Sequence, residues 1–423
     1  MLRRIRLFGL VALLLTACAP AAPTPTTPAT QVAAAPTLAL STAEGAAPTT
    51  TTVPTASATL TSTPSQTPTQ TSTSTLTPTP PVTNPLTGLV VSDPSTMDRR
   101  PLAIKVAHFP RRVREYQVGL SFADNVWEHY AEGGVIRFTA IFLGQSPEKV
   151  GNVRSARLID AILGDAYEAM LVASGSSTGT MNRLRENPDL FQRVIAEARG
   201  YSECPLLCRE ESADVTTDKL YTSPAALWEL ATQLGLNGRQ NLEGFAFDPQ
   251  PPAGGVGATT IHIDFQLNNT VAEYRYDPAT QTYARWIDTA NLPELAPHVD
   301  ALNGQPLTTP NVVVLYVRHA STNIHEEEGG QRYFSYEIFL TGGGPAKLFR
   351  DGQMYDVTWT RADASGGLPR IVDAAGNVAP FHPGTVWFDV LSTDSPTKFD
   401  AEHGLFYVRF KAPNPFPGAT ATP

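Results

Sequence analysis

The sequence is short of charge, of cysteine and of long apolar segments, and each shortage excludes a class of protein. Charged residues make up 17% of the 423 residues, and the formal net charge is −9. From Asn84 onward 28 basic residues face 39 acidic ones, which argues against a nucleic-acid-binding protein or a polybasic membrane-surface protein. Three cysteines are too few for a disulfide-built scaffold or a four-cysteine metal site. No apolar run reaches the roughly 20 residues that a transmembrane helix needs.

The N-terminus has the pattern of an export signal. Arg3, Arg4 and Arg6 precede the short apolar run of residues 7–15, and Leu15-Thr16-Ala17-Cys18 ends it. Small residues directly before a cysteine resemble a bacterial lipobox, which implies removal of residues 1–17 and attachment of lipid, with acyl chains such as palmitate, to Cys18. The alternative is an ordinary secretory signal with an incidental cysteine. The lipobox predicts anchoring on the extracytoplasmic face of the bacterial cell membrane.

Residues 18–83 are predicted to be a lipidated cysteine followed by a disordered tether. Residues 19–83 consist almost wholly of Ala, Thr, Pro and Ser, with one charged residue, Glu44, and no aromatic residue. Such a segment lacks the apolar bulk to build a core. We interpret it as a stalk that carries the folded part into or through a cell wall, and a passive linker is compatible with that interpretation.

The rest of the chain predicts an α+β fold, with a mixed α/β N-terminal domain at 84–248 and a β-rich C-terminal domain at 258–411. In the first domain strands are predicted at 102–108, 126–130, 135–143 and 169–174. One predicted helix is capped by Ser155, and another begins at Ser223-Pro224 and stops at Gly235. Residues 249–257 are a Pro/Gly linker, and 412–423 are a disordered tail.

The predicted C-terminal domain consists of short strands. The predicted strands are 259–266, 272–276, 282–287, 311–318, 333–340, 346–350, 354–360, 385–391 and 406–410. Asp351-Gly352 is typical of a hairpin turn. Residues 325–328 (HEEE) are interpreted as a solvated loop tip, with adventitious cation binding as the alternative.

Cys204 and Cys208 flank a three-residue loop and are predicted to form a local disulfide, since the chain is exported. A metal site is the weaker interpretation because no third and fourth ligand lies nearby in the sequence. A redox pair is more often spaced Cys-x-x-Cys. We predict no metal and no cofactor.

Several stretches occur in an order that matches a known family. They are Asn84-Pro85-Leu86-Thr87-Gly88, the run 131–138 (AEGGVIRF), the run 150–157 (VGNVRSAR), Tyr274-Arg275-Tyr276-Asp277, Tyr283-Ala284-Arg285, Asn311-Val312-Val313-Val314 and Asp351-Gly352 before Trp359. Together they resemble the YerB-type bacterial lipoprotein family, whose members join an uncharacterised N-terminal domain to an uncharacterised β-rich C-terminal domain. The resemblance covers most of 84–411 and departs at 218–223, where the family has a Pro-His-Asn-like run. It implies a surface lipoprotein and no particular activity.

The densest polar cluster contains Glu132, Arg137, Arg154, Ser155 and Arg157. Two arginines at a predicted helix start oppose the helix dipole, yet they suit the binding of an anion. One hypothesis is therefore a pocket for phosphate, pyrophosphate or carboxylate. The other is a structural network in which Glu132 pairs with Arg137, and Asp124 or Asp160 pairs with Arg157.

Enzymatic activity is left uncertain, with a preference for a non-enzyme. Ser155, Ser174, Ser176 and Ser177 are candidate nucleophiles, but the sequence has no Gly-x-Ser-x-Gly elbow. One segment is similar to the LytR-CpsA-Psr wall-glycopolymer ligases, without their Pro-Arg-Asp pattern. The aromatic residues of the second domain are interpreted as core, with a glycan-stacking surface as the alternative.

The sequence thus predicts a lipid-anchored envelope protein that binds an anionic envelope ligand or a protein partner. An envelope phosphotransferase or hydrolase, and an assembly lipoprotein with no small-molecule site, are the alternatives. No nucleic-acid partner is expected.

Overall fold

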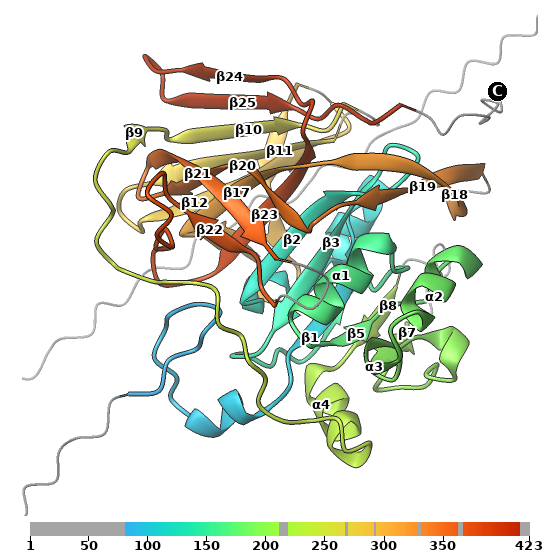
Figure 1. Cartoon of the computed structure of the whole chain (residues 1–423). Helices are drawn as coiled ribbons and strands as arrows, with labels where there is room; N and C mark the ends of the chain where they lie inside the picture. The colour runs from blue at the N-terminus through green and yellow to red at the C-terminus, as the bar shows by residue number, and fades with distance from the viewer. Residues whose placement is uncertain are drawn as a thin grey trace, which may run out of the picture. The chain divides into compact units, whose positions relative to one another are not determined.

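Strands from both halves of the chain pair in one central sheet (Figure 1). The structure is a computed structural model that describes residues 81–210, 219–266, 270–291, 293–328, 331–362 and 367–414. The order of the central sheet is β22 (Arg370–Val372), β21 (Gln353–Arg361), β20 (Gly342–Arg350), β17 (Asn311–Val317), β23 (Val386–Ser392), β2 (Asn125–Tyr130), β3 (Ile136–Phe142), β1 (Leu102–Ala107), β5 (Met170–Val172) and β6 (Val194–Ile195), and β9 (Val256–Gly257) pairs with β21.

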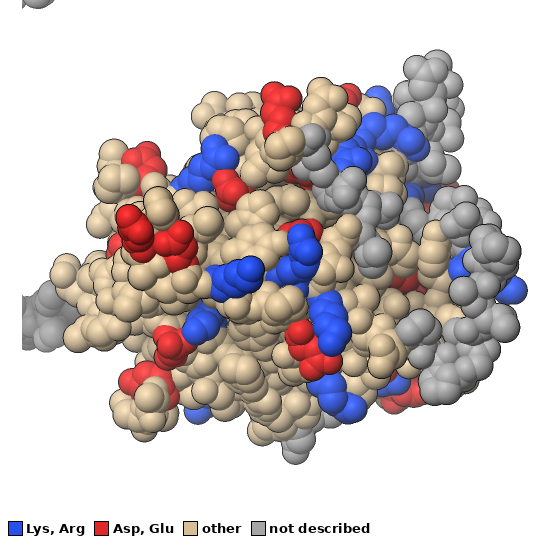
Figure 2. Space-filling view, turned by 90° about the horizontal axis from the view of Figure 1, so that it is seen from above, with Lys and Arg blue, Asp and Glu red and all other residues tan. Residues whose placement is uncertain are grey.

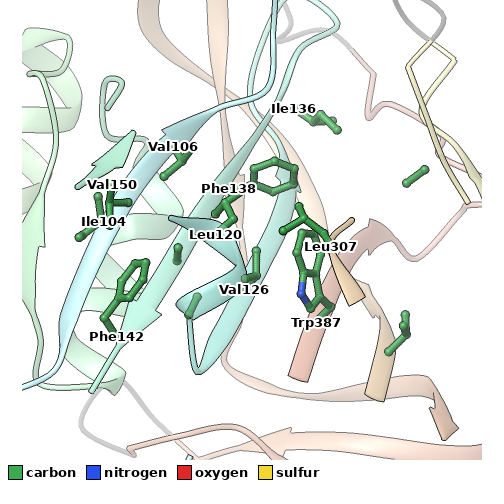
Figure 3. Close-up of a cluster of buried hydrophobic side chains, with 14 of the residues drawn as sticks. Ile104, Val106, Leu120, Val126, Ile136, Phe138, Phe142, Val150, Leu307 and Trp387 are labelled. Atoms are coloured by element: carbon green, nitrogen blue, oxygen red, sulfur yellow. The ribbon is translucent and has the colours of Figure 1, made fainter. Parts of the chain in front are cut away.

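A second sheet lies against one face of the central sheet. Its order is β13 (Leu295–Pro297), β12 (Thr282–Asp288), β11 (Val271–Asp277), β10 (Thr260–Asp264), β25 (Leu405–Arg409) and β24 (Thr397–Asp400), and β16 (Thr308–Thr309) pairs with β12. Apolar side chains of both sheets form one core, part of which Figure 3 shows around Phe138, Val126 and Trp387.

Three α-helices cover the other face of the central sheet, namely α1 (Leu158–Ala166), α2 (Thr178–Arg185) and α3 (Pro188–Phe191). Helix α4 (Pro224–Gln233) instead packs Leu227, Trp228 and Ala231 into the core that both sheets form. Short 3₁₀ helices are η1 (Pro94–Asp98), η2 (Arg111–Tyr116), η3 (Leu120–Phe122) and η4 (Glu197–Arg199). Ile159 and Leu163 of α1 and Leu184 of α2 pack in a second core with Ala103 and Trp127 of the sheet. Because both faces of the central strands are covered, every residue of β1, β2 and β3 is buried, polar residues included.

Three smaller sheets complete the described strands. They are β14 (Val299–Asp300) with β15 (Gln305–Pro306), β18 (His319–Glu328) with β19 (Gln331–Ile338), and β4 (Val150–Gly151) with β8 (Leu220–Thr222) and β7 (Cys208–Arg209). Cys204 and Cys208, at the start of β7, form a disulfide bond.

The mixed α/β character of the first half and the β-rich second half match the predicted fold class. The two predicted domains nevertheless share the central sheet, because β2 pairs in parallel with β23. The described residues form one compact unit, and β9, in the predicted linker, pairs with β21. The signal, Cys18, the tether and most of the predicted tail lie outside the described residues.

Two local predictions were wrong. Ser155 does not cap α1: the helix begins at Leu158, and the N-cap is Arg157, whose N–H donates to the Asp160 carboxylate over 2.6 Å. Residues 325–328 are not a loop tip but the end of β18, where Glu326 is buried. Both errors come from long-range contacts. The backbone on either side of Ser155 bonds to Ser174 and Gly175, beyond the end of β5, and Glu326 accepts from Ser177 and Thr180 of the first half.

Candidate ligand-binding cavity

The loop between β5 and α2 forms one side of the candidate site. β5 runs parallel to both β1 and β6, so this loop leaves the carboxyl end of a parallel strand, where ligands bind in open α/β sheets. Ser177 caps α2, and its hydroxyl oxygen accepts from the Thr180 N–H over 3.2 Å. The first N–H groups of such a helix have no acceptor within the helix. The loop therefore offers hydroxyl and N–H donors in a small space.

The β18–β19 hairpin forms the opposite side. Ile324 of β18 packs so closely on Gly179 that a Cβ at Gly179 would lie 2.5 Å from Ile324 Cγ2. Glu337 of β19 accepts from Arg183 Nη2 of α2 over 2.9 Å. These contacts seat the hairpin on the first two turns of α2.

Glu326 of β18 is only 2% exposed, and its carboxylate joins the two sides of the cavity. Its Oε1 accepts from Ser177 Oγ over 2.8 Å and from Thr180 Oγ1 over 2.7 Å. Its other oxygen, Oε2, lies 3.5 Å from Nη1 of Arg157. One carboxylate thus accepts hydrogen bonds from Ser177 and Thr180 at the start of α2 and pairs with Arg157 at the start of α1.

Arg157 is held on its other side by Glu132, which accepts from Nε and Nη2 of that guanidinium. Burial opposes ionisation of Glu132, but Arg157 and Arg137 outweigh it and hold its pKa below the ordinary value. Arg137 Nη2 lies 3.7 Å from Glu132, and Arg137 Nη1 donates to the Ser155 carbonyl over 3.0 Å. Two guanidiniums and two carboxylates therefore form one buried network, in which Glu132 pairs with Arg137 as the structural hypothesis expected.

The cavity between the loop and the hairpin has a volume of about 670 Å³. It opens to solvent beside exposed Asn182 and His325. The lining is mainly polar and consists of Ser155, Arg157, Ser176, Ser177, Thr178, Gly179, Asn182, Asn323, Ile324, His325, Glu326 and Arg332. Hydroxyl, amide and guanidinium groups dominate it, so the chemistry that the cavity supports is hydrogen bonding to a polar ligand.

A second buried polar group lies behind the cavity, beneath α1. Lys105 Nζ is 2.9 Å from Asp160, 2.5 Å from His129 Nε2 and 3.1 Å from Thr139 Oγ1. Burial lowers the pKa of Lys105 to about 8 although Asp160 opposes that shift, and burial together with Lys105 lowers the pKa of His129 to about 3. All four residues are fully buried, so they support the floor of the site and do not reach a ligand.

The structure places the five predicted site residues in adjacent segments, with different roles. Ser155 and Arg157 line the cavity, whereas Glu132 and Arg137 lie in the network behind it. Arg154 is half-buried, and its N–H donates to the Lys105 carbonyl. Asp124, one predicted partner of Arg157, instead accepts from Asn84 and from the N–H groups of Leu143 and Gly144.

Sequence reasoning missed Glu326, Thr180 and Arg332 as residues of the site. The run 325–328 was interpreted as solvated, and α2 was not predicted because Thr178–Arg185 contains only two large apolar residues. A signal was present, since Ser177 followed by a helix-compatible segment is a capping pattern.

Other predictions concern the surface. Figure 2 shows acidic and basic side chains interspersed over one face of the described residues, without a continuous basic field. Within the described ranges no group of three His, Cys, Asp or Glu residues is placed to hold a metal, and no helix is long and apolar enough to span a membrane. Tyr274 and Tyr283, considered for glycan stacking, are fully buried and belong to the core.

Comparison with known families and structures defines the class of protein. Residues 86–237 match the N-terminal domain, and residues 261–388 the C-terminal domain, of the family described as "Protein of unknown function (DUF3048)". The chain belongs to this family of two-part α+β proteins, the YerB-type lipoprotein family that the sequence motifs indicated.

A curated relative is the "Putative lipoprotein YerB" of Bacillus subtilis (strain 168), 28% identical over 309 residues, which are 73% of this chain and 85% of that protein. The crystal structure of the YerB protein from Bacillus subtilis is similar, with a TM-score of 0.60 and 27% identity over 74% of this chain and 97% of that chain. The relative's name fits an envelope lipoprotein, and the family description assigns no ligand.

Proposed function

We propose that this protein is a lipid-anchored, extracytoplasmic envelope protein that binds a polar, anionic ligand in the cavity between α2 and the β18–β19 hairpin. The observation that carries the proposal is the 670 Å³ cavity whose lining brings Arg157, Arg332 and the hydroxyl groups at the start of α2 together. Guanidinium and hydroxyl donors recognise phosphate and carboxylate groups.

The same geometry favours binding over serine hydrolysis. Ser177 is the cap of α2, and its hydroxyl donates to Glu326, a carboxylate already paired with Arg157. Ser155 Oγ and Ser174 Oγ lie 3.4 Å apart. A nucleophile needs a base that is free to take its proton, and among the described contacts these serines have structural partners instead.

Ligand binding is tested on the purified full chain by thermal unfolding with inorganic phosphate, pyrophosphate and glucuronate at constant ionic strength. A ligand at 100 times its Kd stabilises the folded state by about 2.7 kcal/mol, so we expect a saturable rise in Tm with one of these anions. Arg332→Gln should abolish the rise. Arg370→Gln, an exposed arginine beside a different cavity, is the matched control and should preserve it.

A saturable shift that survives in Arg332→Gln would place binding elsewhere, and the absence of a shift with every anion would refute the binding proposal. Anchoring is tested separately by substituting Cys18→Ser and fractionating cells that express the chain. We expect acyl labelling to disappear and the protein to leave the membrane fraction, whereas an unchanged membrane fraction would contradict a lipid anchor at Cys18.

A further inference from the structure

The Glu326 carboxylate contacts three donor side chains at the cavity, those of Ser177, Thr180 and Arg157. The Glu326 side chain is almost inaccessible to solvent. It belongs to β18, in the second half of the chain, and reaches the start of α2 in the first half. It uses the hydroxyl groups of Ser177 and Thr180 and the guanidinium of Arg157, at 2.8, 2.7 and 3.5 Å. A ligand anion that sought these donors would have to compete with Glu326.

The charges of the buried network define what Glu326 contributes. Arg137 and Arg157 carry two positive charges, and Glu132 and Glu326 carry two negative charges. Glu132 makes the closer pair with Arg157 and is fully buried, so it is the permanent partner. Glu326 lines the cavity, as Glu132 does not. The charge of these four groups therefore stays balanced when one singly charged anionic group replaces Glu326.

We propose that Glu326 is an internal competitor, and that a ligand bearing a phosphate or carboxylate group binds by taking the Ser177, Thr180 and Arg157 donors from it. This inference rests on the proposed function, because it names how the same cavity accepts its anion. The displaced carboxylate regains water at the open side of the cavity. The affinity of the protein for such a ligand is then lower than it would be without Glu326, because binding must first break the contacts of Glu326.

The test compares pyrophosphate binding to the full chain and to two variants by titration calorimetry. Glu326→Gln removes the competing charge but keeps an acceptor for Ser177 and Thr180. Glu402→Gln is the matched control, because it removes an equal charge from an exposed residue that does not line the cavity. We expect at least tenfold tighter binding in Glu326→Gln and an unchanged Kd in Glu402→Gln.

Equal or weaker binding by folded Glu326→Gln would overturn the inference while leaving the proposed function intact, because the wild-type chain would still bind. Failure of both wild type and Glu326→Gln to bind any anion would refute the proposed function itself, and the inference with it.

A second measurement does not depend on the stability of the variant. In a crystal structure of the wild-type chain with pyrophosphate, we expect a phosphate oxygen on Ser177 and Thr180 and the Glu326 carboxylate turned away. Pyrophosphate bound in the cavity with Glu326 still on both hydroxyl groups would contradict the exchange.

Discussion

Arg285 of β12 donates from Nη2 to both carboxylate oxygens of Glu128 of β2, over 2.8 and 2.7 Å, although 157 positions separate the two residues. Both side chains are buried between the two sheets. Asp389 of β23 lies beside them, and burial and the Glu128 charge raise its pKa well above the ordinary value. The Arg285 guanidinium thus neutralises a site that contains two carboxyl groups, Glu128 and Asp389, and links the two halves of the chain.

Substitution of Arg285→Met is expected to destabilise the protein by about 3–5 kcal/mol, because it leaves Glu128 buried without a counter-charge. Urea unfolding followed by circular dichroism measures this loss. Arg275→Met is the matched control on the neighbouring strand. Arg275 is exposed and pairs with Glu273 at the surface, so its loss should cost at most about 1 kcal/mol. Equal effects of the two substitutions would contradict a structural role for the buried pair.

Lys105 predicts a pH dependence of stability on the alkaline side. Its pKa is about 8 in the folded protein and 10.5 in the unfolded chain, so the unfolded state binds more protons between these values. The contribution of Lys105 to stability should therefore rise with pH from 8 to 10.5, by no more than about 1.4 kcal/mol per pH unit. Urea unfolding of wild type and Lys105→Met between pH 7 and 10.5 isolates this contribution as a difference. A difference that stays constant with pH, or shrinks, would show that burial does not lower the pKa of Lys105 in the folded protein.

Arg157 and Arg332 line the same cavity but should differ in their effect on stability. Arg157 is buried and neutralises two carboxylates, so Arg157→Met should cost about 3–5 kcal/mol of unfolding free energy. Arg332 is exposed, and because exposed charge pairs contribute little to stability, Arg332→Gln should change the unfolding free energy by no more than about 1 kcal/mol. Chemical denaturation of the two variants distinguishes the roles, and a stable Arg157→Met protein would mean that the network is dispensable for folding.

The sequence predicted elements whose apolar pattern is local and strong. The β-branched and aromatic runs of β3 and β17 were expected as strands, and Ser223-Pro224 with Gly235 marked α4. Asp351 and Gly352 both have positive φ at the β20–β21 turn, as the hairpin signal required.

The site was predicted only in part because one of its two carboxylates, Glu326, comes from a distant strand. Arg157 and Glu132 were recognised together since they flank neighbouring elements. Nothing local distinguishes Glu326 from Glu327 or Glu328, and its burial follows only from the contacts with Ser177, Thr180 and Arg157. Partners so far apart in the chain cannot be paired from one sequence.

Gly179 decides how closely the hairpin approaches α2. Alanine in the first turn of a helix is intrinsically better than glycine by about 1 kcal/mol, so propensity alone predicts that Gly179→Ala stabilises the protein. The new Cβ would lie 2.5 Å from Ile324 Cγ2 and 2.8 Å from Cγ1, however, and a β-branched side chain cannot turn away easily. Such overpacking costs about 1–3 kcal/mol, so the net effect should be destabilising.

The loss should be local as well as global, with faster amide hydrogen exchange in β18 as its signature. Gly175→Ala is the matched control, because a Cβ at Gly175 meets no atom within 4 Å and its backbone does not require glycine. Hydrogen exchange in β18 should stay at the wild-type rate in that variant. A stabilised Gly179→Ala protein with unchanged exchange in β18 would show that the hairpin does not rest on the first turn of α2, and the cavity described between them would lose one of its two sides.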